Sequence, residues 1–173
     1  MLEIVPAETE EHYRQLRELM AELTAWDTAQ VIELGLDAKA MLDFYYRAYE
    51  ETLPGDLAPP EGCLLFATYS AKPAGCAGFH RMTAEVCEMK RMYVRPEFRR
   101  SGVGRELVRR LIEAARAAGY GVMRLETTTF MHKAIALYSA LGFRTCEPYY
   151  VIPESFRPIT VFMDLNLRAE PPR

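Results

Sequence analysis

The first sixty residues carry two helical patterns between a short strand and a turn-rich loop. An apolar run at 2–7 predicts a strand that ends at Pro6. From Glu8 to Trp26 large apolar residues recur every three or four positions, which predicts an amphipathic helix. A second helix is predicted from Ala38 to about Glu51, and the Pro- and Gly-rich segment 53–62 then predicts a loop.

Three extended segments follow. The apolar runs at 62–70 and 76–82, with turn residues at 71–75 between them, predict a β-hairpin. The run at 86–94 predicts a third strand, which stops before Pro96. Its alternation places the side chains of Glu88, Lys90 and Met92 on one face of the sheet and those of Met89, Arg91 and Tyr93 on the other. A bulge in the strand would change this pattern.

Helical and extended patterns alternate in the remaining part. A helix is predicted from about Gly102 to a left-handed cap at Gly119, followed by a strand at 122–130, a helix at 133–143 and a last strand at 160–167. Only the strands on either side of the Gly102 helix form a βαβ unit. We therefore expect one α/β (α+β) domain over residues 1–173, with a mixed, mostly antiparallel sheet, a central parallel pair and flanking helices.

Composition is that of an ordinary globular chain. Half of the 173 residues are hydrophobic and 26% are charged, which argues against disorder. We expect a cytoplasmic protein without a membrane partner, since no apolar stretch approaches the roughly 20 residues of a spanning helix and the amino terminus lacks a signal-peptide pattern. The four cysteines and three histidines show no metal-ligand spacing, so no metal is expected.

Charge is distributed unevenly along the chain. Residues 1–61 hold fourteen acidic and four basic side chains, a balance of −10, so the rest carries +7 of the total of −3. Seven arginines and three glutamates lie between Arg95 and Arg116. A local positive field on an acidic protein favours a small polyanion over nucleic acid, which we do not expect as a partner.

The segment "FRRSGVGREL", residues 98–107, combines this charge with glycines where a strand passes into a helix. The first amides of a helix lack intrahelical partners and carry partial positive charge, so this position suits a phosphate. Gly102 and Gly104 would let an anion approach the main chain, while Arg99, Arg100 and Arg105 can add charged hydrogen bonds. A P-loop is excluded because Lys and Ser or Thr do not follow Gly104.

Two motifs carry a resemblance to a known family. "RRSGVG" is similar to the R/Q-x-x-G-x-G/A pyrophosphate loop of the GNAT superfamily of N-acetyltransferases, with Arg99, Gly102 and Gly104 at its defining positions. "KAIALYSALGF" resembles the second signature of that family, A-x-x-L-Y-x-x-x-G-F. The resemblance implies acetyl-CoA as donor and a small-molecule amine or peptide as acceptor. The cofactor-binding residues implied are Met92, Val94, Arg99, Arg100, Ser101, Gly102, Val103, Gly104 and Arg105.

The resemblance also implies roles in the reaction. Two parallel strands of the family splay apart near Met92 and Val94, and the Met92 amide would stabilise the oxyanion. Tyr138 is the candidate general acid; the alternative is that it is only an aromatic residue of the core. Glu88 is the candidate acceptor of the amine proton; the alternative is that it is a solvated or salt-bridged strand residue without a role in the reaction. Met131 replaces the Asn that usually contacts the CoA arm, which puts that contact in doubt.

The sequence leaves the acceptor and the partners open. The acceptor pocket would be walled by the first two helices and the segment "EPYYVIPESF", and His80, His132, Arg81, Lys90 and Arg91 could help to select the acceptor. A non-catalytic acyl-CoA-binding regulator is the alternative to an enzyme, and a nucleic-acid module comes third. Dimers are common in the resembled family, which makes a homodimer an option.

Overall fold

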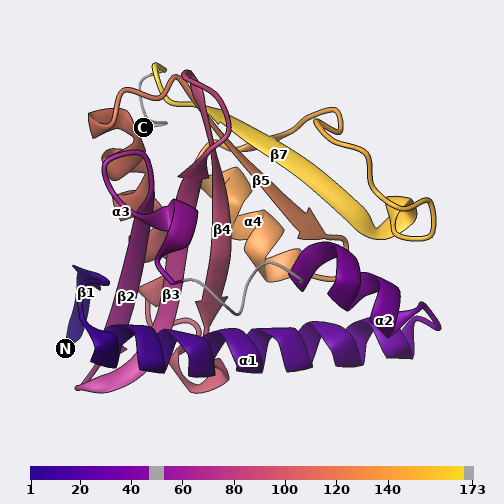
Figure 1. The fold of residues 1–173 in the computed structure, drawn as a ribbon, viewed down its shortest axis with the longest axis horizontal. Coiled ribbons are helices and arrows are strands. Elements are labelled where there is room, and N and C mark those ends of the chain that lie inside the picture. The colour runs from indigo at the N-terminus through magenta and orange to yellow at the C-terminus, as the bar shows by residue number, and fades with distance from the viewer. Residues whose placement is uncertain (47–52, 170–173) are drawn as a thin grey trace.

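A twisted seven-stranded sheet forms the middle layer of the molecule (Figure 1). The computed structural model describes residues 1–46 and 53–169. The strand order is β1-β2-β3-β4-β5-β7-β6, and every neighbouring pair is antiparallel except β4 and β5. The strands are β1 (Leu2–Pro6), β2 (Cys63–Tyr69), β3 (Lys72–Arg81), β4 (Val86–Val94), β5 (Val122–Thr128), β6 (Arg144–Thr145) and β7 (Thr160–Asn166).

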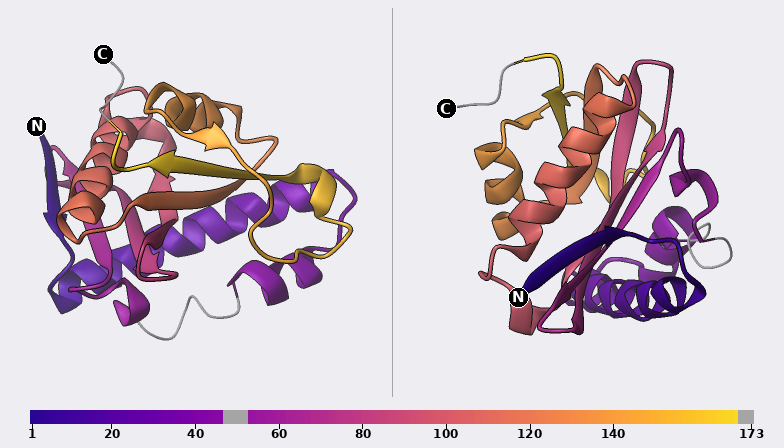
Figure 2. Two further views of the ribbon diagram at one scale, coloured as in Figure 1. Left: turned by 90° about the horizontal axis from the view of Figure 1, so that it is seen from above. Right: turned by 90° about the vertical axis from the view of Figure 1, so that its left-hand side faces the viewer.

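Helices cover both faces of this sheet (Figure 2). Helices α3 (Val103–Ala117) and α4 (His132–Ala140) lie on one face, and α1 (Glu10–Glu33) and α2 (Ala38–Met41) lie on the other. Helix α2 continues into one π-helical turn, Leu42–Tyr46. Short 3-10 helices occupy Gly55–Leu57, Pro96–Phe98 and Arg157–Ile159.

The burial pattern of α3 explains why it packs on the sheet. Of the apolar stripe predicted from the sequence, Val103, Leu107 and Leu111 are fully buried against β2, β3 and β4. The other two predicted members, Ala114 and Ala118, are half-buried and exposed, and Ala115 is fully buried instead. Burying one such leucine stabilises the fold by about 2 kcal/mol. On the other face, Leu16 and Leu19 of α1 enter a second apolar cluster with Phe66 and Tyr93. The two layers thus fix β3 and β4 from both sides.

The predicted central parallel pair is confirmed, and it opens along its length. Strands β4 and β5 pair only from Val86 opposite Val122 to Met89 opposite Leu125. Beyond this point β4 continues to Val94 and β5 to Thr128 without pairing to each other, and the two ribbons diverge (Figure 1). The mixed, mostly antiparallel sheet with a splayed central pair is therefore confirmed.

Some element bounds differ from the sequence prediction. Helix α1 runs seven residues beyond Trp26, and the chain then turns at Gly35, which has φ +71°. The turn predicted at 71–75 is wrong, because a tight turn at Ser70 and Ala71 lets β3 begin at Lys72. The second predicted helix is observed to residue 46, and the rest of that prediction, 47–51, lies outside the described residues.

Candidate active site

The loop from Arg99 to Gly102 forms a concave turn at the start of α3. Arg99 is extended, while Arg100 and Gly102 have φ +69° and +87°. The hydroxyl of Ser101 donates to the carbonyl of Phe98 at 2.6 Å, which closes the turn. A Cβ at Gly102 would meet nothing within 4 Å, so the open side of the loop faces free space.

The main-chain amides of this loop are available to a ligand. The first hydrogen bond of α3 runs from the amide of Glu106 to the carbonyl of Gly102. Among the described residues, no acceptor at hydrogen-bond distance is found for the amides from Arg100 to Arg105. Gly102 caps the helix without a side-chain hydrogen bond. These donors and the helix dipole together form a site for an anion.

Three exposed arginines surround these amides. Arg99, Arg100 and Arg105 form no ion pair with a carboxylate in the part of the chain that the structure describes, and Arg99 only donates to the carbonyl of Val94. The other arginines of the segment are held elsewhere: Arg95 by Glu22, Arg109 and Arg110 by Glu106, and Arg116 by the carbonyl of Leu167. The positive charge that remains is therefore concentrated at the loop.

A bulge in β4 connects this loop to the splay. Lys90 lies opposite Gly78 and Tyr93 opposite Cys76, so β4 holds one extra residue, and Arg91 has φ +57°. The bulge resets the alternation, as the sequence allowed, and turns Met92 and Val94 toward the face covered by α3. A Cβ at Gly104 would lie 3.3 Å from Cε of Met92 and 3.6 Å from Cγ2 of Val94. Glycine at 104 thus allows α3 to start directly against the splayed strand.

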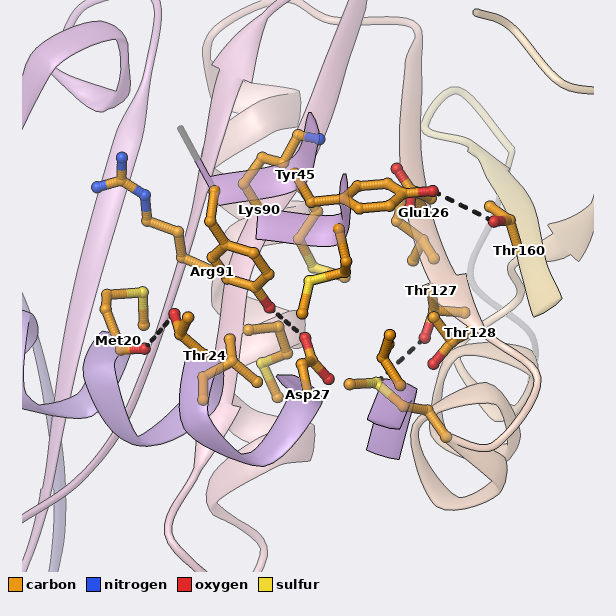
Figure 3. A pocket seen from close by; sticks show the side chains of 18 of the residues that line it. Met20, Thr24, Asp27, Tyr45, Lys90, Arg91, Glu126, Thr127, Thr128 and Thr160 are labelled. Carbon is orange, nitrogen blue, oxygen red and sulfur yellow. Dashed lines mark hydrogen bonds between the residues drawn. The ribbon is translucent and has the colours of Figure 1, made fainter. Parts of the chain in front are cut away.

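A cavity of about 310 Å³ occupies the splay and extends toward α1 and α2 (Figure 3). Met92 and Tyr138 both line it. Tyr138 comes from α4 and is only 5% exposed, and burial raises the pKa of its hydroxyl above the ordinary value. The hydroxyl is therefore protonated at neutral pH, so it is a hydrogen-bond donor inside the cavity. The structure brings the two together; their roles stay a prediction.

Glu88 is buried in a polar network beside the cavity and is absent from the residues that line it. Its Oε2 lies 2.9 Å from Nε2 of His80 and 3.2 Å from Nζ of Lys90, and its Oε1 accepts from the hydroxyl of Tyr149 at 2.8 Å. Burial alone would raise the pKa of Glu88, but His80, the Lys90 charge and Tyr149 outweigh it and hold that pKa below the usual range. A carboxylate satisfied by three donors is a weak base.

A different carboxylate lines the cavity. Glu126 follows Leu125, the last residue of β5 that pairs with β4, and it lies on the splay. Burial raises the pKa of Glu126 to about 7; the Lys90 charge lowers it, and the Glu88 and Asp27 charges raise it further. A carboxylate with a pKa near neutrality can take up a proton at physiological pH.

Asp27 from α1 also lines the cavity. Burial raises its pKa to about 6, although a hydrogen bond from the hydroxyl of Tyr46 to Oδ2 acts the other way. Sequence reasoning missed both carboxylates. The predicted helix ended at Trp26 and left Asp27 out, whereas Glu126 is the one acidic residue of its strand pattern and offered a usable signal.

The other residues considered as acceptor-selecting are spread over several places. His80 belongs to the Glu88 network, Arg81 pairs with Glu61, and His132 is exposed at the start of α4. Lys90 and Arg91 line the cavity. Met131 lines it too, and its sulfur accepts from the hydroxyl of Thr127 at 3.4 Å, so a thioether stands where the family has an amide.

The fold and the loop define an acyltransferase-type architecture: a sheet whose parallel pair splays beside a helix start with main-chain amides that have no acceptor among the described residues. The Acetyltransferase (GNAT) family matches residues 14–143, and this chain belongs to that family. The family uses acetyl-CoA, which confirms the predicted donor at the level of the family. The amides, the arginines and the splay described above fit such a donor.

Individual relatives agree with this assignment. The chain is 40% identical over 111 residues, 63% of its length, to an uncharacterized N-acetyltransferase of Schizosaccharomyces pombe, of which it spans 66%. It is 36% identical over 112 residues to an IAA acetyltransferase of Azospirillum brasilense. The aligned region covers 64% of this chain and 72% of that protein. A crystal structure from Klebsiella pneumoniae, assigned to the acyl-CoA N-acyltransferases, superposes with a TM-score of 0.70 at 26% identity and covers 96% and 98% of the two chains.

Across residues 1–46 and 53–169, no three His, Cys, Asp or Glu side chains gather closely enough to hold a metal ion. In the same ranges, no helix has the length and apolar character needed to cross a membrane.

Proposed function

We propose that the protein transfers an acetyl group from acetyl-CoA to the primary amine of an acceptor bound in the same cavity. The observation that carries this proposal is the meeting of three groups in one cavity: the splayed strand at Met92, the buried hydroxyl of Tyr138 and the carboxylate of Glu126. The loop from Arg99 to Arg105 lies next to that strand, since a Cβ added at Gly104 would lie 3.3 Å from Cε of Met92. The loop that would bind the donor therefore lies next to the cavity in which the acceptor would react.

The donor supplies an activated thioester carbonyl, and the chain supplies the groups around it. The amides from Arg100 to Arg105 and the exposed arginines would hold the pyrophosphate. The Met92 amide lies on the part of β4 that does not pair with β5. It would orient the carbonyl oxygen and stabilise negative charge on it. Because that donor is main chain, it is preorganised by the sheet.

Two side chains move protons in this proposal. Glu126 accepts the proton that the acceptor ammonium loses, so that the neutral nitrogen can form its bond to the acetyl carbon while the carbon–sulfur bond breaks. Tyr138 donates its proton to the departing sulfur, and the second proton lost by the new amide nitrogen restores the Tyr138 hydroxyl. The raised pKa of Glu126 supports its assignment, because a base with a pKa near 7 suits the first step. The raised pKa of Tyr138 makes its hydroxyl a weaker acid, so its assignment rests on its place in the cavity. Glu88, the base expected from the sequence, stays a second candidate for the first step.

A regulator that binds acyl-CoA without turnover is the alternative. The cavity and the raised pKa of Glu126 favour an enzyme, since binding of acyl-CoA without turnover does not require a base next to the splayed strands. The test is release of CoA from acetyl-CoA with a panel of primary amines, combined with calorimetry of CoA binding. Binding without release from any amine would favour the regulator, and absence of binding would refute both.

The pH dependence tests Glu126. In the wild type, kcat/KM should rise as pH passes through about 7, where Glu126 loses its proton. Glu126→Gln should lower kcat/KM by roughly 10²–10⁴-fold and remove that rise, with CoA affinity unchanged. A Glu126→Gln enzyme with wild-type rates and an unchanged profile would take this residue out of the mechanism.

A further inference from the structure

The end of the cavity farthest from α4 is formed by α1, α2 and the π-helical turn (Figure 3). Among the described residues, the acidic group at this end is Asp27, which extends from α1 toward the strands. We propose that Asp27 binds a second, protonated nitrogen of the acceptor, so that the acceptor is a compact diamine whose reacting amine meets Glu126. This inference rests on the proposed acetyltransfer and adds the class of acceptor to it.

The two oxygens of Asp27 have unequal partners. Oδ2 accepts a hydrogen bond from the hydroxyl of Tyr46, which fixes the carboxylate. Oδ1 is buried, and among the described residues it meets no hydrogen-bond donor. A buried carboxylate oxygen without a donor is costly, so a native structure supplies one. Since Asp27 lines the cavity, a bound molecule with an N–H group can be that donor.

Apolar side chains from both the helices and the sheet line the cavity, alongside threonines and charged groups. Met20, Leu23 and Met41 line the cavity from the helices, and Met89 and Leu125 line it from the sheet. A chain of methylene groups suits such a wall, whereas a second polar group in the middle of the acceptor would lose its hydration there. The acetyl end of the donor also needs part of the 310 Å³, which leaves room for a small acceptor.

Charged side chains of both signs line the cavity, with Asp27 and Glu126 as its carboxylates among the described residues. Asp27 and Glu126 act on each other as like charges, and the Asp27 charge contributes to the raised pKa of Glu126. Lys90 lines the cavity but its Nζ lies 3.2 Å from Oε2 of Glu88, and Arg17 lines it as an exposed side chain. Arg91 lines the cavity as well, but its side chain runs away from Asp27 (Figure 3). An ammonium at Asp27 would therefore meet a carboxylate first.

The experiment compares acceptors that differ only at the far end. CoA release is measured with 1,4-diaminobutane and 1,5-diaminopentane, with butylamine and pentylamine, and with 5-aminopentan-1-ol, which keeps a donor but lacks the charge. For the wild type we expect kcat/KM to favour the better diamine over its monoamine by roughly 10- to 100-fold, mainly through KM, as for a hydrogen bond between charged groups. The amino alcohol should lie close to the monoamine.

Asp27→Asn should remove this preference, so that kcat/KM with the diamine falls to about that with the matching monoamine in the same variant. Glu33→Gln is the matched control, because Glu33 lies on the same helix, is exposed and does not line the cavity. It removes one negative charge and should keep the preference for diamines. Tyr46→Phe should reduce the preference partly, since the carboxylate loses the hydroxyl that fixes it.

A preference that survives in Asp27→Asn, or equal rates for diamine and monoamine in the wild type, would overturn the inference. Calorimetry of diamine binding to the CoA-loaded wild type and to Asp27→Asn separates this from failure of the proposed function. If no amine releases CoA, acetyltransfer fails as a function, while weaker diamine binding in Asp27→Asn would still support the subsite. Equal diamine binding to both proteins would reject the subsite whatever the turnover.

Discussion

Nζ of Lys90 lies 3.2 Å from Oε2 of Glu88. Glu126 lies close enough to feel the charges of both residues but is not part of this ion pair. Both members act on Glu126 through their charges, since Lys90 lowers its pKa and Glu88 raises it. Glu88 also holds His80 and Tyr149, at 2.9 and 2.8 Å. Glu88 can therefore influence the reaction as a positioning residue even though it does not line the cavity.

Glu88→Gln should shift the acid limb of the pH profile rather than abolish activity. The substitution removes a negative charge near Glu126 and releases Lys90, and both effects lower the pKa of Glu126. We expect the rise in kcat/KM to move to lower pH by roughly 0.5–1 unit. The measurement is kcat/KM from pH 5 to 9 with one monoamine acceptor.

Glu85→Gln is the control for this shift, because Glu85 is exposed and pairs with Arg168 instead. Its profile should match that of the wild type. A loss of several orders of magnitude in Glu88→Gln, with no acid limb left, would identify Glu88 as the base and would contradict the assignment of Glu126. An unshifted limb at wild-type rates would mean that Glu88 serves the fold alone.

Tyr138→Phe should lower kcat by roughly 10²–10⁴-fold and leave the Kd for CoA within about twofold. The ring remains to pack against Phe143, 5.9 Å away between centroids, so the fold keeps its contact while the acid is lost. Stopped-time assays of CoA release and calorimetry provide the two numbers.

Tyr120→Phe is the matched control for Tyr138→Phe. Tyr120 is also buried, at 7% exposure, but its hydroxyl donates to the carbonyl of Glu61 and it does not line the cavity. It should lose about 1 kcal/mol of stability and keep its kcat. If the two variants turned over equally well, Tyr138 would be a core residue and no acid.

Gly102→Ala should weaken CoA binding by distorting the loop that holds the pyrophosphate. A Cβ meets no atom within 4 Å at this position, so the cost comes from φ +87°, which L-residues disfavour by about 1 kcal/mol. We expect a fall in CoA affinity of roughly tenfold or more by calorimetry.

Gly119→Ala offers the same strain at the opposite end of α3. Gly119 has φ +90° and equally open surroundings, and it lies far along the chain from the loop. Both variants should lose similar stability in thermal unfolding, whereas CoA affinity should fall only in Gly102→Ala. Equal affinities would place the pyrophosphate elsewhere.

The sequence predicted the elements whose patterns are local. The stripe of α3 and the glycines at 102 and 104 are adjacent in sequence to the loop they form, and the βαβ unit around α3 determines the parallel pair. The loop geometry and the fold class were therefore accessible from the sequence.

The acceptor side depended on contacts that are distant in sequence. Asp27 enters the cavity only because α1 continues past Trp26, and its neighbour Tyr46 lies in a π-helical turn that no periodicity indicates. Glu88 and Glu126 have the same side-chain chemistry, and only the packing of His80, Lys90 and Tyr149 around Glu88 distinguishes them. Charge compensation of this kind cannot be predicted from a linear pattern.

Glu126→Gln should stabilise the fold at pH 8, independently of any effect on activity. The pKa of Glu126 is raised in the folded protein, from 4.5 to about 7, so the native state favours the protonated form. The wild type therefore loses stability as pH rises from about 4.5 through 7, on the order of 1–3 kcal/mol. Glutamine mimics the neutral form and escapes this loss, so the gain should be largest above pH 7 and vanish below about pH 4.5.

The opposite sign is expected at Glu106, whose pKa is lowered to about 2 by hydrogen bonds from Arg109 and Arg110. Its charged form stabilises the fold above the unfolded pKa of 4.5. Glu106→Gln should therefore destabilise at pH 8, by less than about 1 kcal/mol because solvent screens these exposed pairs. Urea unfolding of both variants and the wild type at pH 4, 6 and 8 measures the two trends. Destabilisation of Glu126→Gln at pH 8 would mean that Glu126 is ionised and well paired in the native state, and its assignment as the base would lose its physical basis.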